Sequence, residues 1–138
     1  MTTRGEAETL VLAEGLAAGL RGGEVVLLTG ELGSGKTAFV RGLARGLGVD
    51  PDEVQSPTFV LLTSYLGRLT LHHADLYRLS GTGDEVELGL DELPGVRGVL
   101  AVEWADRLQD EPWPRAVRVH LAHAGEDRRT VRIEQEPS

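Results

Sequence analysis

Residues 30–37 read GELGSGKT and include Lys36, the single lysine among the 14 cationic residues of the chain. The segment matches the pattern G-x-x-x-x-G-K-[ST] of phosphate-binding loops at every fixed position: Gly30, Gly35, Lys36 and Thr37. Glycines in such a loop allow successive backbone N–H groups to point into one concavity, which binds phosphate oxygens. A lysine adds a compact charge on a flexible stem, whereas the planar fork of an arginine has a different shape. The segment therefore predicts a site for nucleotide phosphates.

The pattern also assigns roles within the loop. Lys36 is expected to contact the β- and γ-phosphates, and the hydroxyl of Thr37 is expected to bind Mg²⁺. A predicted strand precedes the loop and a predicted helix follows it, so the helix dipole would add to the anion site. The remaining expected contacts come from Leu32, Gly33, Ser34 and Gly35. A glycine-rich turn that matches the pattern by chance is the alternative interpretation.

Two carboxylates follow predicted strands. Asp75 comes after LTLHHA, and Glu103 comes after the apolar run GVLAV, as in a Walker B element with glutamate in place of aspartate. Ligands of open α/β sheets bind beyond the carboxyl ends of the strands. A phosphate loop needs an acid that holds the metal or orients the attacking water, and we predict that Asp75 and Glu103 are the candidates for this role. For either residue taken alone, a solvated carboxylate at a strand end is the alternative.

Three further features lie near these positions. The segment SPTF (56–59) offers the hydroxyl of Thr58 to phosphate, Mg²⁺ or water, although a proline turn that enters a strand is equally consistent with it. His72 and His73 are adjacent in a predicted strand and face opposite sides, so they cannot both bind one metal. We expect one of them to pack in the core or the hairpin. Trp104 is expected to be a packing residue rather than a platform for a base.

Two helices must position the loop. Apolar residues at helical spacing predict an amphipathic helix over residues 6–20 and another over residues 38–47. Thr3 and Glu6 have the spacing of a capping box at the start of the first helix. The glycine pair at 22–23 is expected to stop it.

Apolar runs at residues 24–29 and 98–102 are typical of strands buried in a parallel sheet. Residues 81–95 are rich in glycine and acids, which predicts a loop with a short helix near residues 85–88. Two antiparallel hairpins are expected, formed by residues 59–65 with 69–76 and by residues 116–121 with 129–134. The fold class is thus α/β: a P-loop NTPase-like sheet with a mostly parallel core and antiparallel hairpins, flanked by helices, in one domain over residues 1–138.

The composition excludes several classes of protein. The chain has 138 residues, 22 acidic against 14 basic side chains, a net charge of −8 and no cysteine. A surface this acidic is poorly suited to grip nucleic acid, because phosphate contacts need clustered cations. The absence of cysteine excludes disulfides and thiolate chemistry. Because no apolar run approaches the ~20 residues of a membrane helix and no apolar leader follows Met1, we expect a cytoplasmic protein without membrane contact.

Taken in order, the motifs resemble the TsaE (YjeE) family of bacterial ATPases, which serve threonylcarbamoyladenosine (t6A) modification of tRNA. The resemblance extends over nearly the whole chain, from Glu6 to Ile133. The ordered set SPTF, then HADLYRL, then EW, is far more specific than the phosphate loop alone. The matching segments are EAET, GELGSGKT, SPTF, HADLYRL, VEW and RTVRI.

The resemblance implies ATP and Mg²⁺ as cofactors, with Thr37 and Glu103 as the Mg²⁺ ligands. It implies Lys36 on the phosphates and Asp75 at the γ-phosphate or the water. It adds Glu6 and Arg129 as further nucleotide contacts. The implied activity is slow ATP hydrolysis in isolation, by an accessory protein that works with TsaB and TsaD and reaches tRNA only through that complex.

Three other functions are weighed against this one. A small-molecule kinase of the same fold usually carries an arginine-bearing lid, and the chain has no insertion of that size. A GTPase typically recognises guanine through N-K-x-D, and the chain has no asparagine and no second lysine. We therefore expect a preference for ATP over GTP. The third alternative is a nucleotide-dependent docking module whose hydrolysis is incidental. Only an ATP turnover that depends on the partner proteins would distinguish the accessory ATPase from such a module.

Overall fold

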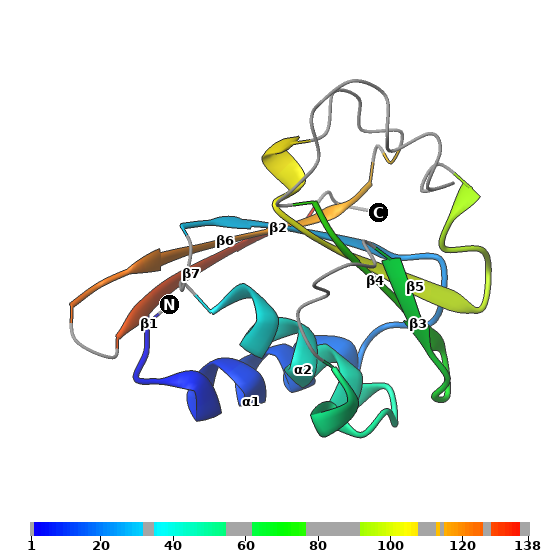
Figure 1. Cartoon of the computed structure of the whole chain (residues 1–138), viewed down its shortest axis with the longest axis horizontal. Helices are drawn as coiled ribbons and strands as arrows, with labels where there is room; N and C mark the ends of the chain where they lie inside the picture. The colour runs from blue at the N-terminus through cyan, green and yellow to red at the C-terminus, as the bar shows by residue number, and fades with distance from the viewer. Residues whose placement is uncertain are drawn as a thin grey trace.

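The computed structural model describes residues 2–31, 35–54, 62–76, 92–107, 113, 115–125 and 128–135 (Figure 1). Strands and helices alternate from the N-terminus to the second helix, and strands dominate thereafter. In chain order the elements are β1 (Thr2–Thr3), α1 (Glu6–Ala17), β2 (Val25–Gly30), α2 (Lys36–Gly46), η1 (Pro51–Glu53), β3 (Leu62–Tyr65), β4 (Thr70–Asp75), β5 (Gly98–Glu103), η3 (Ala105–Arg107), β6 (Val117–His123) and β7 (Arg129–Glu134).

The strands form one seven-stranded sheet in the order β1-β7-β6-β2-β5-β4-β3. The central strand β2 runs parallel to both β5 and β6, and β5 runs parallel to β4. The outer pairs β3–β4, β6–β7 and β1–β7 are antiparallel. The predicted fold class, with its parallel core and two hairpins, is therefore confirmed. Because chain order departs from spatial order beside β2, ligands are expected at the carboxyl end of this strand.

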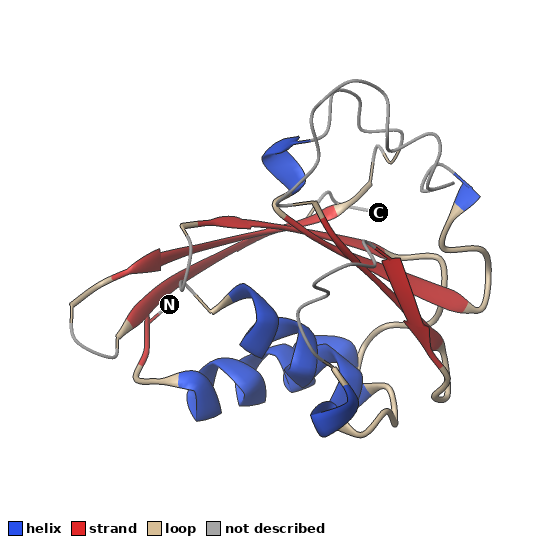
Figure 2. Ribbon diagram, in the orientation of Figure 1, coloured by secondary structure: helices blue, strands red, loops and turns tan. Residues whose placement is uncertain are grey.

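Both α-helices cover the same face of the sheet (Figure 2). Alternation along β2 sends Val26 and Leu28 into the larger core beneath these helices, and Val25 and Leu27 into a smaller core on the opposite face. β5 is buried along its whole length, as the continuous apolar run at residues 98–102 predicts. Strands β2 and β5 are thus packed against a hydrophobic core on each face of the sheet.

Two glycines set how closely the helices approach. A Cβ atom at Gly42 of α2 would collide with the carbonyl oxygen of Leu10 and would lie 2.6 Å from Cβ of Ala13, both in α1. A Cβ atom at Gly46 would lie 2.5 Å from Cβ of Ala17. Only residues without side chains allow this backbone contact, so the glycines fix the position of α2 and of the loop that precedes it.

The first helix ends earlier than predicted, at Ala17 rather than at residue 20. Beyond that residue the chain tightens, since the amide of Gly19 donates to Leu16 and that of Leu20 donates to Ala17. Arg68, from the turn between β3 and β4, donates to the carbonyl oxygens of Ala17 (2.7 Å) and Leu20 (2.9 Å). Leu20 remains buried, which explains why helical spacing in the sequence continues past the true end of the helix.

The predicted capping box is wrong. The N-cap residue is Gly5, with φ of 127°, and no side chain of the described residues caps the helix. Thr3 lies in β1, opposite Arg129 of β7, and its hydroxyl is 2.7 Å from that of Thr9. Pairing with β7 therefore draws Thr3 away from the capping position.

The second helix begins at Lys36, two residues before the predicted start, because the loop ends at Gly35. The hairpin of β3 and β4 is confirmed over the described residues, whereas the predicted strand residues 59–61 lie outside them. Residues 77–91 also lie outside, and with them the predicted helix near 85–88 and most of the predicted loop 81–95. Among the described helices, none is long and apolar enough to cross a membrane.

Candidate functional site

The start of α2 has two features of an anion-binding site. Gly35 has φ of 103°, a left-handed conformation that favours glycine, and its carbonyl oxygen accepts the amide of Phe39 at 2.9 Å. The first turn of α2 contains no acidic residue. The positive end of the helix dipole is thus not neutralised by the helix's own side chains, as a phosphate site requires.

Lys36 folds back onto the loop. Its Nζ donates to the carbonyl oxygens of Gly30 (2.6 Å) and Glu31 (2.8 Å), and the residue is only 4% exposed. The ammonium also lies 3.9 Å from the centre of the Trp104 ring, within the range of a cation–π contact. The predicted phosphate-binding lysine is therefore buried at the C-terminal end of β2.

Burial lowers the pKa of Lys36 below its usual value. Four carboxylates oppose this shift through their negative charge: Glu103 most strongly, then Asp106, Asp75 and Glu31. The lysine is therefore surrounded by acids that belong to three separate parts of the chain.

Thr37 and Glu103 meet across the site. The hydroxyl of Thr37 donates to Oε1 of Glu103 at 3.0 Å and lies 3.3 Å from Oε2. Glu103 ends β5 opposite Leu28 of β2, and it is only 2% exposed. The two residues that the sequence assigns to one metal, separated by 66 positions, are thus in direct contact.

The carboxylate of Glu103 has a second partner, His73 of β4. Nε2 of His73 lies 2.5 Å from Oε2 of Glu103, and the histidine is 0% exposed. His72 points to the other face, where its Nδ1 lies 2.7 Å from the hydroxyl of Ser64. The prediction that the two histidines face opposite sides is confirmed, but His73 does more than pack.

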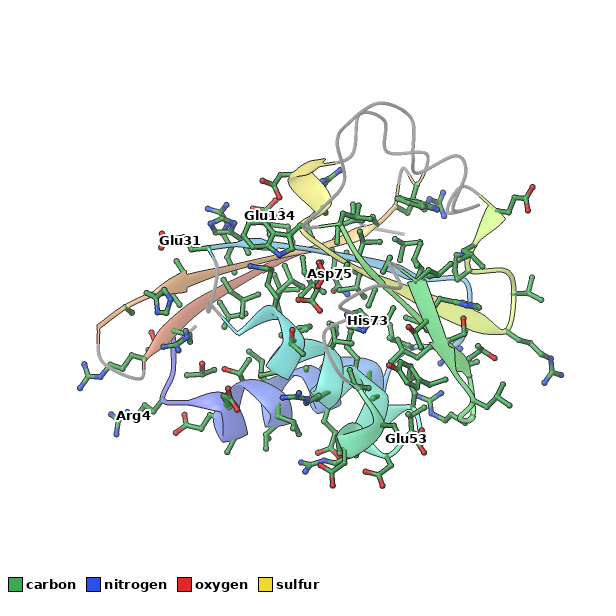
Figure 3. All side chains as sticks on the ribbon, in the orientation of Figure 1. Arg4, Glu31, Glu53, His73, Asp75 and Glu134 are labelled. Atoms are coloured by element: carbon green, nitrogen blue, oxygen red, sulfur yellow. The ribbon has the colours of Figure 1, made fainter. Side chains whose placement is uncertain are left out.

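Asp75 ends β4 directly opposite Glu103 in the parallel register. It is 9% exposed, and it shares with His73 the side of β4 that faces the helices (Figure 3). The structure thus brings both predicted strand-end carboxylates together beside the start of α2.

Trp104 follows Glu103 with φ of 60°, an uncommon conformation for a residue with a side chain. The prediction that it only packs is incomplete, because its ring contacts Lys36 and borders an open pocket of about 500 Å³. The lining residues of this pocket are Thr29, Gly30, Glu31, Trp104, Asp106, His120, Leu121 and Ala122.

Glu6 begins α1, three residues after Thr3 of β1, and Arg129 begins β7, which pairs with β1. Glu6 is exposed in the first turn of α1, and Arg129 pairs with Thr3. The guanidinium of Arg129 donates to the carbonyl oxygen of Arg128 at 3.0 Å. Their contacts with a nucleotide stay a prediction. The remaining predicted contacts, Leu32, Gly33, Ser34 and Thr58, lie outside the described residues.

The residues present fit a magnesium ion. Thr37 and Glu103 supply hard oxygen donors, which Mg²⁺ prefers. In the described part of the chain, no group of three or more His, Asp or Glu side chains could hold a metal. Mg²⁺ at phosphate sites takes one or two protein ligands and completes its shell with phosphate oxygens and water, so a sparse protein donor set is what such a site needs.

The sequence reasoning missed His73 as a partner of Glu103 and Trp104 as a partner of Lys36. A signal for the first was present, because residues 73 and 75 must share one face of their strand. No sequence signal indicates the second, since the contact depends on the backbone turn at residue 104.

Comparisons with known proteins agree on one family. Residues 3–131 match the family model described as "Threonylcarbamoyl adenosine biosynthesis protein TsaE". The chain is 42% identical over 114 residues to a protein of Treponema pallidum named tRNA threonylcarbamoyladenosine biosynthesis protein TsaE, with 83% of this chain and 84% of the other covered. A protein of the same name from Aquifex aeolicus is 41% identical over 130 residues, with 93% and 90% covered.

A solved structure is also similar. The crystal structure of YdiB from Bacillus subtilis aligns with a TM-score of 0.71 and 32% sequence identity, over 95% of this chain and 80% of that one. The resemblance noted from the ordered motifs is thereby confirmed. The chain belongs to the TsaE family.

Proposed function

We propose that this protein binds ATP with Mg²⁺ at the start of α2 and hydrolyses it. The observation that carries the proposal is the hydrogen bond from Thr37 to Glu103, 3.0 Å long, beside Lys36. It joins the last residue of a phosphate-loop motif to a buried carboxylate at the end of the neighbouring parallel strand. The same pair of groups holds Mg²⁺ in P-loop ATPases, with glutamate here in the position of the usual aspartate.

In this proposal, Lys36 leaves the carbonyl oxygens of Gly30 and Glu31 and binds the β- and γ-phosphates instead. Backbone N–H groups at the start of α2 bind the same phosphates along the helix dipole. Bound Mg²⁺ would neutralise charge on the phosphate oxygens. Asp75, opposite Glu103 in register, orients the water that attacks the γ-phosphate, and the products are ADP and phosphate.

The membership of the TsaE family assigns the chain to threonylcarbamoyl adenosine biosynthesis. We propose that it acts there as an accessory ATPase of the cytoplasm, together with TsaB and TsaD, and that it contacts tRNA only through that complex. The acidic composition, with a net charge of −8, supports the indirect route to tRNA.

Calorimetric titration with ATP and Mg²⁺ tests the nucleotide site. Lys36→Ala removes the cation of the loop and should weaken binding by at least ~2 kcal/mol, or about 30-fold. Arg45→Ala is the matched control: it removes one positive charge from the same helix, where Arg45 pairs with Glu14 at 2.7 Å on the surface. Native affinity in Lys36→Ala, or equal losses in both variants, would contradict the phosphate site.

Turnover measurements separate the accessory ATPase from a docking module. We expect slow ATP hydrolysis by the protein alone and faster hydrolysis when TsaB, TsaD and tRNA are present. Hydrolysis that does not respond to any of them would favour a docking module with incidental turnover. Phosphate transfer to a small acceptor in place of water would favour a kinase.

A further inference from the structure

His73 occupies an unusual place for a histidine. It is 0% exposed and lies in β4 on the same side as the buried Leu71 and as Asp75, which face the helices. Its Nε2 lies 2.5 Å from Oε2 of Glu103, whereas its Nδ1 has no hydrogen-bond partner among the residues that the structure describes. Burying an unsatisfied polar atom destabilises a fold, so an apolar side chain of similar size would serve packing better.

If the carboxylate of Glu103 is charged, only His73 can be the donor in the hydrogen bond between them. A carboxylate only accepts hydrogen bonds, so Nε2 carries the hydrogen and donates it. In the neutral tautomer that donates from Nε2, the remaining ring nitrogen, Nδ1, is an acceptor.

The carboxylate of Glu103 is therefore held from two sides. Thr37 of α2 donates to Oε1 at 3.0 Å, and His73 of β4 donates to Oε2. Two donors on different oxygens, from elements on two sides of the carboxylate, restrict rotation about the terminal bond of the glutamate side chain. With 2% exposure, little water reaches Glu103 to replace either donor.

We propose that His73 is a positioning residue for the metal site: it holds Glu103 in the orientation in which this carboxylate and Thr37 bind the divalent cation together. The inference rests on the proposed function, because it assumes that Thr37 and Glu103 hold that cation. Partners that hydrogen-bond metal-binding carboxylates typically contribute 10–100-fold to metal affinity or activity. His73 does not itself contact the nucleotide or the cation in this arrangement.

The test compares two substitutions of nearly equal length. His73→Gln keeps an N–H donor near the position of Nε2, whereas His73→Met fills a similar space without a donor. Binding of Mn²⁺ to the protein–ADP complex is measured by electron paramagnetic resonance of the free ion. We expect His73→Met to raise the dissociation constant of Mn²⁺ by about 10–100-fold, and His73→Gln to restore most of the native affinity.

Two further variants serve as controls. His73→Asn stays polar but is too short to reach Glu103, so it should lose affinity as His73→Met does, even if the methionine variant folds poorly. His72→Met alters the adjacent histidine, which contacts Ser64 on the other face, and should bind Mn²⁺ like the native protein. Binding of ADP without metal should be unchanged in all four variants, because no altered residue contacts the phosphates.

Each outcome is decisive. Native Mn²⁺ affinity in His73→Met, or equal losses in His73→Gln and His73→Met, would overturn the positioning role while leaving the nucleotide site intact. Failure of the native chain to bind Mn²⁺ together with ADP would overturn the proposed function itself, and the role of His73 with it.

Discussion

Glu103 interacts with several of the other residues of the candidate site. Its carboxylate accepts from Thr37 and His73, and its negative charge is the strongest of those that favour the charged form of Lys36. The next residue, Trp104, places its ring against the same lysine. One glutamate at the end of β5 thus connects the loop, the helix start and the neighbouring strand.

Removal of the negative charge of Glu103 should reduce ATP hydrolysis far more than ATP binding. Glu103→Gln keeps the size of the side chain but loses the charge that we propose holds the cation, so we expect ATP turnover to fall by ~100-fold or more. ATP binding should persist in part, because Lys36 and the start of α2 remain. Steady-state kinetics and calorimetry on the same protein check both expectations.

The control for this prediction is Glu134→Gln. Glu134 is an exposed glutamate at the end of β7, where it pairs with Arg132 at 3.1 Å. Its loss should leave turnover at the native level. Full hydrolysis by Glu103→Gln would mean that the strand-end carboxylate has only a structural role.

At the scale of elements, the packing of α2 against α1 positions the phosphate loop. Gly42 and Gly46 allow the two helices to touch through their backbones, and Arg68 holds the end of α1 from the β3–β4 turn. Because Lys36 and Thr37 form the first turn of α2, a shift of this helix would move both of them relative to Glu103.

Gly42→Ala should therefore destabilise the fold although alanine favours helix formation. The added methyl group meets Leu10 and Ala13 of α1, and overpacking of this kind costs about 1–3 kcal/mol against a propensity gain of up to ~1 kcal/mol. Denaturant unfolding measures the net loss in the free energy of unfolding.

Gly15→Ala is the counterpart in α1. In the described part of the chain, Gly15 has nothing within 4 Å of the position that a Cβ atom would take, so the same substitution should stabilise the protein by about 0.5–1 kcal/mol. A stabilised Gly42→Ala, or equal changes in the two variants, would show that the helices do not approach as closely as described.

At the scale of the whole molecule, the sheet carries its two α-helices on one face and its site at the carboxyl ends of β2, β4 and β5 (Figure 1). The overall charge is −8, so the molecule as a whole repels a polyanion. The proposed role in tRNA modification therefore involves contacts with other proteins rather than direct binding of tRNA.

We expect no appreciable tRNA binding by the protein alone at ~150 mM salt, where scattered arginines neutralise too few phosphates. Filter binding measures this. Gel filtration with the TsaB–TsaD pair should show co-elution that requires ATP and is lost in Lys36→Ala but kept in Arg45→Ala. Submicromolar tRNA binding by the lone protein, or no association with the pair under any nucleotide, would contradict this expectation.

The sequence by itself determined the local parts of the fold and of the candidate site. Strict spacing placed Lys36 and Thr37 at the junction between a buried strand and a helix, because glycine positions and apolar runs act on neighbouring residues. The same reasoning put Asp75 and Glu103 at strand ends. The two hairpins and the α/β fold class followed from the alternation of apolar residues and from the turn residues. Where the structure describes these hairpins, they differ from the prediction in where the strands begin and end.

The tertiary structure alone decided which of these parts meet. β4 and β5 are joined by 22 intervening residues, from 76 to 97, so their parallel register depends on packing of the whole sheet rather than on local pattern. That register brings His73 to Glu103, and the backbone turn at Trp104 brings its ring to Lys36. The capping box failed for the same reason: strand pairing between Thr3 and Arg129 outweighed a local hydrogen bond, since long-range contacts compete with local ones and spacing along the chain does not report them.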